Sequence, residues 1–122
     1  MTIAILIDPF AKVVCKANLN LQDFEEIYTL LKCKTVDFAP FGDYGDKLLV
    51  DDEGLFVPTE KQTYFTFATE NLGRITLAGY GLVVGTNEGG DWKSPTSTQN
   101  DVVARTSWLE QSKGAAYAAQ FR

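Results

Sequence analysis

The sequence contains no histidine among its 122 residues. This absence removes imidazole bases, Ser-His and Cys-His nucleophilic pairs, and nearly every kind of catalytic zinc site. The groups that remain for catalysis are carboxylates, lysines and tyrosines. We therefore expect a protein that is not an enzyme and that uses no cofactor.

Cysteine is scarce as well, because Cys15 and Cys33 are the only two in the chain. Two thiols are too few for a disulfide scaffold, so we expect both to be reduced and expect folding to need neither a disulfide nor a metal ion. No apolar run approaches the roughly 20 residues that cross a bilayer. Residues 1–10 are apolar but lack the basic segment and the cleavage site of a signal peptide. These absences favour a cytoplasmic protein that does not bind membranes.

The length and composition are those of one globular domain. Hydrophobic residues make up 45% of the chain and charged residues 22%, and a domain commonly has about 100–150 residues. We expect a single domain, residues 1–122, with its core within residues 2–112. The last segment, 113–122, is expected to fray because so short a helix is marginal in water. The alternative is that it docks through Tyr117 and Phe121.

Hydrophobic patterning in the first half predicts an N-terminal hairpin followed by a helix. Strands are expected at residues 2–8 and 12–17, and the helix is expected from Leu21 to Lys32 with Asn20 as its N-cap. Short strands separated by turns then form a meander, and they are predicted at residues 33–41, 47–50, 55–57 and 64–67. The fold class is therefore α+β, with a mixed, mainly antiparallel sheet on which the helix packs.

The second half contains the densest strand signal, in residues 74–85, where Gly79-Tyr80-Gly81 predicts a bulge or a close backbone approach. A C-terminal helix is predicted from Gln99 to Ser112. Thr98 and Asp101 have the spacing of a capping box at its start, and Gly114 is expected to end it.

The loop Gly85–Asp91 combines glycines with polar residues between a strand and Pro95. Gly85 and Gly90 have the spacing of a phosphate-binding loop, but that motif needs a lysine directly after the second glycine, and Asp91 stands there. An ordinary turn is therefore favoured. A small-ligand or nucleotide-binding protein, or a ligand sponge, that uses this loop remains an alternative function.

Acidic residues gather in one part of the sequence. The net charge is −5, and between Asp37 and Glu60 Lys47 is the only basic residue. Direct nucleic-acid binding is disfavoured, since it calls for a basic surface. Such a charge run can simply face solvent, or it can bind a basic protein surface or imitate nucleic acid. The predicted protein-interaction residues are Asp43, Asp46, Asp51, Asp52, Glu53 and, as an aromatic anchor in a polar loop, Trp92.

The same run leaves one enzymatic alternative open. Asp51, Asp52 and Glu53 are hard oxygen ligands that suit a divalent cation, so a carboxylate-only, metal-dependent enzyme is conceivable. The run lacks the alternating spacing and the final glutamate of a calcium loop. A solvated hairpin turn is the favoured interpretation.

Three short motifs carry a family resemblance. They are the acidic turn Asp52-Glu53-Gly54-Leu55, the strand from Gly79 to Gly85 and the loop from Glu88 to Asp91. With the preceding hairpin and helix, they resemble the small, poorly characterised domains that bacteriophages and mobile elements encode. The resemblance implies a phage-encoded accessory protein that acts in the host cytoplasm. Together with the acidic run, it leads us to expect a host protein with a basic surface as partner, such as a defence or gene-expression factor.

Overall fold

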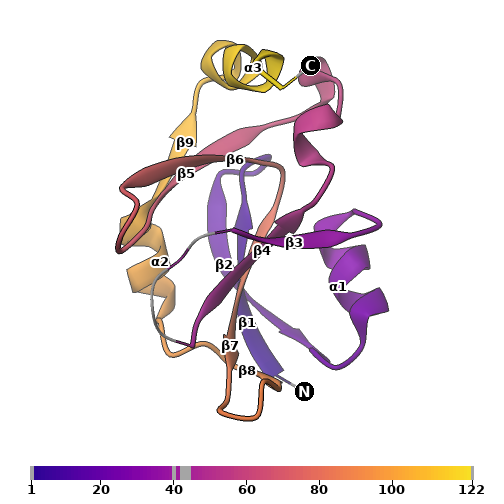
Figure 1. The fold of residues 1–122 in the computed structure, drawn as a ribbon, viewed down its shortest axis with the longest axis vertical. Helices are drawn as coiled ribbons and strands as arrows, with labels where there is room; N and C mark the ends of the chain where they lie inside the picture. Colours follow the sequence, from indigo (N-terminus) through magenta and orange to yellow (C-terminus); the bar gives the residue numbers. More distant parts are fainter. Residues whose placement is uncertain (1, 40, 42–44, 122) are drawn as a thin grey trace.

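The computed structural model describes residues 2–39, 41 and 45–121, and its strands form two antiparallel sheets with helices around them (Figure 1). The larger sheet has the order β2-β1-β7-β4-β3 with β8 paired to β7, and the smaller has the order β6-β5-β9. The strands are β1 (Thr2–Asp8), β2 (Val13–Leu19), β3 (Val36–Ala39), β4 (Lys47–Asp51), β5 (Tyr64–Ala68), β6 (Arg74–Ala78), β7 (Gly81–Thr86), β8 (Trp92–Lys93) and β9 (Thr106–Leu109). The α-helices are α1 (Phe24–Leu31), α2 (Gln99–Arg105) and α3 (Gln111–Ala119). The predicted α+β class and the N-terminal hairpin are confirmed.

The larger sheet is covered on both faces, which explains the unbroken apolar run of β1. Ala4 and Leu6 belong to the hydrophobic cluster under α1, while Ile5 and Ile7 belong to the cluster shared with the smaller sheet. Alternate residues of a strand point to opposite faces, so a strand between two layers needs apolar residues throughout. The centre of the molecule is therefore a sheet-on-sheet core, closed at one side by Val102 of α2.

Helix α1 begins later than expected, because Asp23 and not Asn20 is its N-cap. The Asp23 side chain accepts a hydrogen bond from the Glu25 backbone N–H, whereas the Asn20 side chain accepts one from Gln22 and closes the turn before the helix. The helix buries Ile27 and Leu31 against the larger sheet. The predicted N-cap was wrong because Asn20 and Asp23 can both cap a helix, and the Asn20 side chain is bonded within the turn that precedes α1.

The two sheets are joined where Gly79 and Gly81 were expected to distort the backbone. Gly79 has a φ of +83°, and its N–H donates to the Thr63 carbonyl at 2.8 Å. A Cβ on Gly81 would lie 3.0 Å from the Phe65 ring, which is tighter than ordinary contact, so the glycine favours the close approach of the two sheets. The predicted close approach is confirmed, and it marks the crossing from β6 in one sheet to β7 in the other.

The predicted strand 55–57 is wrong, because Gly54–Phe56 forms a short 3₁₀ helix. Strand β4 already has β3 and β7 as neighbours, so no hairpin partner is needed after it. A Cβ on Gly54 would lie 2.8 Å from the Ala78 carbonyl oxygen, which shows how tightly the chain passes β6. Phe56 is left exposed as the chain turns.

The predicted helix 99–112 is also wrong in its second half. The capping box of Thr98 and Asp101 is present and starts α2, but the helix ends at Arg105. Residues 106–109 form β9, which pairs with β5 and places Trp108 against the core. Thr and Trp favour strands, and pairing with β5 decides the conformation.

Gly114 lies inside α3 and does not end a helix. A Cβ at this position would lie 2.1 Å from the Tyr64 ring, so the missing side chain lets α3 sit directly on the smaller sheet. Ala118 is fully buried at the same contact. Of the segment 113–122, which was expected to fray, residues 113–119 are thus helical and docked through Gly114 and Ala118, at the end of the molecule opposite the N-terminus (Figure 1). In the part of the chain that the structure describes, no helix is long and apolar enough to span a bilayer.

Candidate functional site

The predicted acidic interaction residues do not form one surface. Asp43 lies outside the described residues. Asp46 is buried, with 6% of its surface exposed, which corrects its assignment to a docking surface. Asp52 and Glu53 are exposed, and Asp51 is half-buried at the end of β4.

Asp46 holds a distant loop in place. Its carboxylate accepts hydrogen bonds from the Thr96 N–H at 2.8 Å, from the Ser97 N–H at 2.8 Å and from the Ser97 hydroxyl at 2.7 Å. The loop between β8 and α2 is therefore fixed by a residue about fifty positions earlier in the chain. Sequence reasoning gave Asp46 a surface role because its donors are remote in sequence.

Asp51 has a perturbed carboxyl group. Burial raises the pKa of Asp51, and the nearby charges of Glu53 and Asp52 raise it further, while the hydrogen bond from the Glu53 N–H opposes the shift. That hydrogen bond is 2.9 Å long. Burial, followed by the charge of Asp51, also raises the pKa of Cys33 to about 11. Asp51 therefore lies where solvent is partly excluded and where its charge affects a neighbouring thiol.

Beside Asp51 lies a cavity of about 240 Å³, which we call the acidic cleft. It lies where β3, at the edge of the larger sheet, approaches β6, at the edge of the smaller one. Among the described lining residues the charged ones are all carboxylates, and the other walls are mostly apolar with Tyr117 of α3 at one side. The carboxylates are Asp37, Asp51 and Asp52, and the apolar walls include Val50, Leu55 and Leu77.

Strand β3 joins this cleft to an aromatic pair on the other face of the sheet. Asp37 lies opposite Val50, whereas Phe38 lies opposite Leu49 under α1. Phe38 is 58% exposed, and its ring centroid is 5.7 Å from that of the half-buried Trp92. Alternation along an edge strand thus brings the predicted anchor Trp92 next to a residue that sequence reasoning missed. The sequence does hold a signal for an exposed position here, because a proline shortly after Phe38 is typical of a strand at the edge of a sheet.

The loop Gly85–Asp91 forms the β7–β8 hairpin. The N–H groups of Asn87, Gly90 and Asp91 donate within the turn, to the Asp91 carbonyl, the Asn87 carbonyl and the Asn87 side chain. Gly90 takes a φ of +85°. The expected turn is confirmed, and these N–H groups are already bonded, so they do not form a cradle for phosphate.

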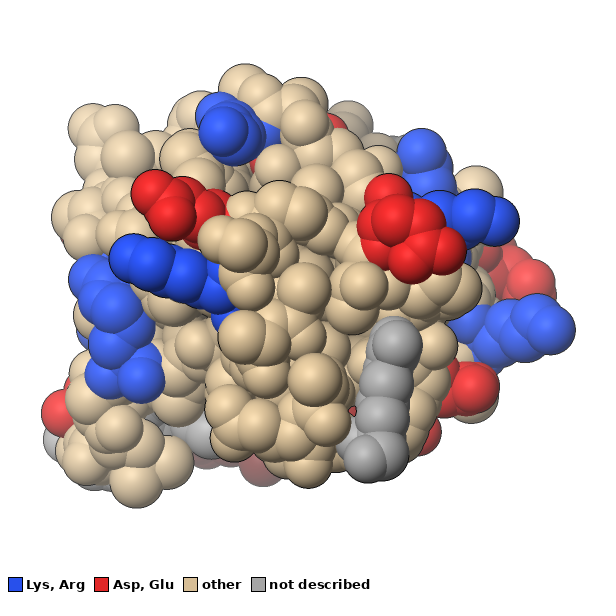
Figure 2. Space-filling model, turned by 90° about the horizontal axis from the view of Figure 1, so that it is seen from above, with Lys and Arg blue, Asp and Glu red and all other residues tan. Residues whose placement is uncertain are grey.

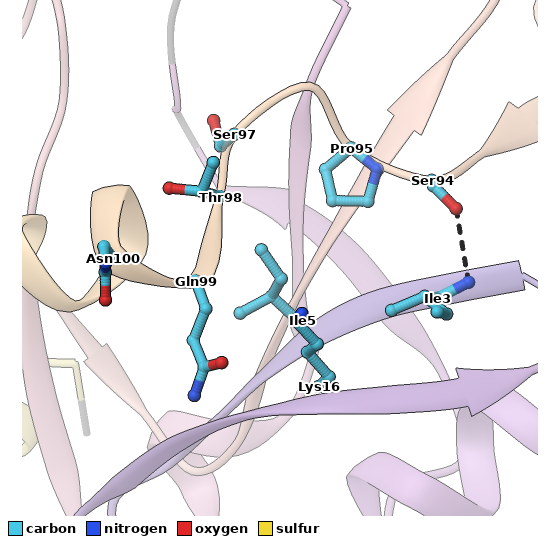
Figure 3. Close-up of a pocket in the computed structure, with 9 residues that line it drawn as sticks. All are labelled: Ile3, Ile5, Lys16, Ser94, Pro95, Ser97, Thr98, Gln99 and Asn100. Carbon is cyan, nitrogen blue, oxygen red and sulfur yellow. Dashed lines mark hydrogen bonds between the residues drawn. The ribbon is translucent and has the colours of Figure 1, made fainter.

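A second cavity, of about 460 Å³, lies between β1, β2 and the start of α2. Figure 3 shows Ile5 and Lys16 side by side on paired strands, facing the segment 94–100. This segment is held by the Asp46 contacts and by two further hydrogen bonds, from the Ile3 N–H to the Ser94 hydroxyl and from the Gln99 side chain to the Val14 carbonyl. Lys16 is the one charged side chain among its described lining residues, so the cavity offers little electrostatic selectivity.

Two further observations concern charge. Within the described residues, no group of three or more Cys, Asp or Glu side chains is arranged to hold a metal ion, so the carboxylate-only enzyme gains no ligand set there. Figure 2, the view onto the α3 end, shows acidic and basic residues next to each other on both sides of a broad uncharged area. That end of the molecule is not a surface of one sign.

The fold and clefts define a small α+β domain of two packed antiparallel sheets, with an acidic cleft between the edges of the sheets. Comparison with family models, with curated proteins and with solved structures finds no match for this chain.

Proposed function

We propose that this protein is a non-enzymatic binding protein that receives a basic segment of a partner protein in the acidic cleft. The observation that carries this proposal is the lining of the cleft. Asp37, Asp51 and Asp52 are its charged residues in the described part of the chain, and they stand beside apolar walls. A cleft of one charge sign attracts and orients a partner of the opposite sign.

Lysine and arginine side chains match both parts of the lining. Their methylene stems pack on apolar groups such as Val50 and Leu77, while the charged ends reach the carboxylates. A bound cation also favours the ionised form of Asp51, whose pKa burial raises. Binding therefore strengthens as the pH rises through the pKa of Asp51.

The partner is expected to bind mainly through side chains and not by adding a strand to β3. The Phe38 N–H is bonded to the Asp37 carboxylate at 2.9 Å, which occupies a donor that an added strand needs. The exposed Phe38 ring and the neighbouring Trp92 provide an apolar contact at the same edge. Large aromatic side chains of this kind are frequent anchors in interfaces.

The identity of the partner is proposed from the resemblance to phage-encoded domains. An accessory protein of a phage acts on host proteins, so a host defence or gene-expression factor with a basic surface suits the acidic cleft. A partner that itself binds nucleic acid carries such a surface, and the cleft then acts as a mimic of nucleic acid.

The test compares two triple variants with the same change in net charge. The cleft variant carries Asp37→Asn, Asp51→Asn and Asp52→Asn, which keep the side-chain oxygens that accept backbone hydrogen bonds. The control carries Glu25→Gln, Glu88→Gln and Glu110→Gln, all at exposed positions outside the cleft. A fluorescent peptide of alternating lysine and alanine serves as the probe, with anisotropy giving affinity and stopped flow giving the association rate.

We expect the cleft variant to bind the probe about tenfold more weakly than the wild type, mainly through slower association, and the control to change about twofold. Equal losses in both variants contradict the cleft and indicate only an effect of net charge. Host proteins retained from lysate by the wild type and the control, but not by the cleft variant, then identify the partner.

A further inference from the structure

A cleft of about 430 Å³ next to the acidic cleft is lined by two lysines, Lys32 and Lys61, and shares Asp51 with the acidic cleft. It lies between the β1–β2 turn, the end of α1 and the Gly79 crossing. Phe10 and Tyr80 face each other there with ring centroids 5.0 Å apart. Phe10 is 45% exposed, so part of its surface is free for contact with a ligand.

Two lysines stand beside these rings. The Lys32 ammonium lies 5.4 Å from the centroid of the Tyr80 ring, and Lys61 lines the cleft from the segment before β5. Neither lysine forms an ion pair with a described residue. Asp51 is the one carboxylate among the described lining residues, so the two lysines give the cleft a net positive lining in a chain whose net charge is −5.

The walls of this cleft are held by the backbone. Lys32 ends α1 with a φ of +53°, and its N–H donates to the carbonyls of Tyr28 and Thr29. Gln62 is buried, and its side-chain amide donates to the Gly54 carbonyl at 2.9 Å. These contacts fix the positions from which Lys32 and Lys61 extend, so a ligand meets a preformed site.

We infer that this cleft binds a phosphate ester that carries an aromatic base, of the nucleoside monophosphate class. The base stacks on the free face of Phe10, as bases stack on aromatic side chains in nucleic-acid-binding proteins. The phosphate is held by Lys32 and Lys61. Asp51, which lines the same cleft, accepts a hydrogen bond from an exocyclic amino group of the base. Stacking, cations and an acceptor are the groups that such a ligand needs, and the site does not involve the Gly85–Asp91 loop.

Isothermal titration with adenosine monophosphate tests this inference, with adenosine and inorganic phosphate as partial ligands. We expect the nucleotide to bind about tenfold more tightly than either part, because stacking and charge pairing then act together. The variants Lys32→Met, Lys61→Met and Phe10→Ala should each weaken nucleotide binding about fivefold. The matched control, Lys113→Met on the exposed surface of α3, should leave it unchanged.

Amide chemical shifts show where the nucleotide binds and whether each variant is folded. Perturbations at Tyr80, Lys32 and Gln62 support the site. Absence of saturable nucleotide binding overturns the inference, as does an equal loss in the Lys113→Met protein. Inorganic phosphate binding as tightly as the nucleotide also overturns it, because the lysines then form a simple anion site. The variant Asp37→Asn, Asp52→Asn should keep full nucleotide affinity, which separates this site from the acidic cleft.

Discussion

The acidic residues of this protein work in two regions that differ in what their carboxylates contact. At the loop between β8 and α2, Asp46 is buried and accepts three hydrogen bonds from Thr96 and Ser97. In the acidic cleft, Asp37 and Asp51 accept hydrogen bonds from backbone N–H groups one and two residues ahead. The hydrogen bonds of the first region join distant parts of the chain, while those that Asp37 and Asp51 accept in the second region come from neighbouring residues.

This difference separates a structural carboxylate from available ones. A carboxylate whose two oxygens both accept hydrogen bonds inside the protein has little left to offer a partner. A carboxylate bonded through one oxygen to its own strand keeps the other for a cation. Local density of acidic residues in the sequence is therefore a poor measure of where a basic partner binds. The contacts of each carboxylate decide it.

The largest effect is expected for Asp46→Ala. The change removes the acceptor for three donors, and unsatisfied donors in a partly buried site are costly. We expect unfolding in denaturant to show a loss of about 3 kcal/mol, while Asp52→Ala in the acidic cleft should change stability by less than about 0.5 kcal/mol. Similar losses for the two variants contradict the distinction between the regions.

The packing of α3 on the smaller sheet is an apolar attachment whose contribution to stability can be compared with that of the Asp46 hydrogen bonds. Gly114 packs on the Tyr64 ring, so Gly114→Ala places a methyl group where ring atoms already lie. We expect a loss of about 2 kcal/mol, measured by denaturant midpoint, with Ser112→Ala on the exposed side of α3 as the control. A neutral result shows that α3 shifts easily and that Asp46 is the stronger attachment.

The parts of the fold that local sequence determines were predicted well. Strand β1 has the predicted bounds, and the capping box of Thr98 and Asp101 starts α2 as expected. In both cases the signal lies within a few adjacent residues. Strand β9 was missed because its conformation depends on pairing with β5, about forty residues earlier.

The same reason limits prediction of the candidate sites. Composition located the acidic run but did not show that Asp46 is buried, since its donors come from residues 96 and 97. The aromatic pair of the second cleft joins Phe10 to Tyr80, which are seventy positions apart. Contacts that depend on the crossing between the two sheets leave no local pattern in the sequence.

A smaller effect is expected for Asp51→Asn, which should be favourable for stability. Burial raises the pKa of Asp51 in the folded state, so the ionised carboxylate opposes folding above that pKa and the protonated form does not below it. The asparagine keeps the acceptor for the Glu53 N–H. At pH 7 we expect a gain of less than about 1 kcal/mol, because solvent reaches the group, and no gain near about pH 3.

Thermal unfolding across this pH range measures the difference. The same variant should bind the basic probe more weakly, so stability and binding change in opposite directions. Such opposition is expected where a charged group is kept for function. A loss of stability at pH 7 indicates instead that Asp51 is a structural carboxylate like Asp46.

The smallest effect is expected at Cys33, whose thiol senses the charge of the acidic cleft. Burial raises its pKa to about 11, with Asp51 as the second cause, so little thiolate is present near neutral pH. Alkylation by iodoacetamide at pH 8 should be slower than for a free cysteine by about two orders of magnitude. Removing the charge with Asp51→Asn should speed the reaction by about two- to fivefold, because burial, the main cause of the raised pKa, remains.

The control Asp46→Asn should leave the pH dependence of this reaction unchanged, since Asp46 is not among the groups that shift the pKa of the thiol. Mass spectrometry of the modified peptide follows the rate, and an unchanged rate in Asp51→Asn contradicts the interpretation that the charge of this carboxylate reaches beyond its own strand.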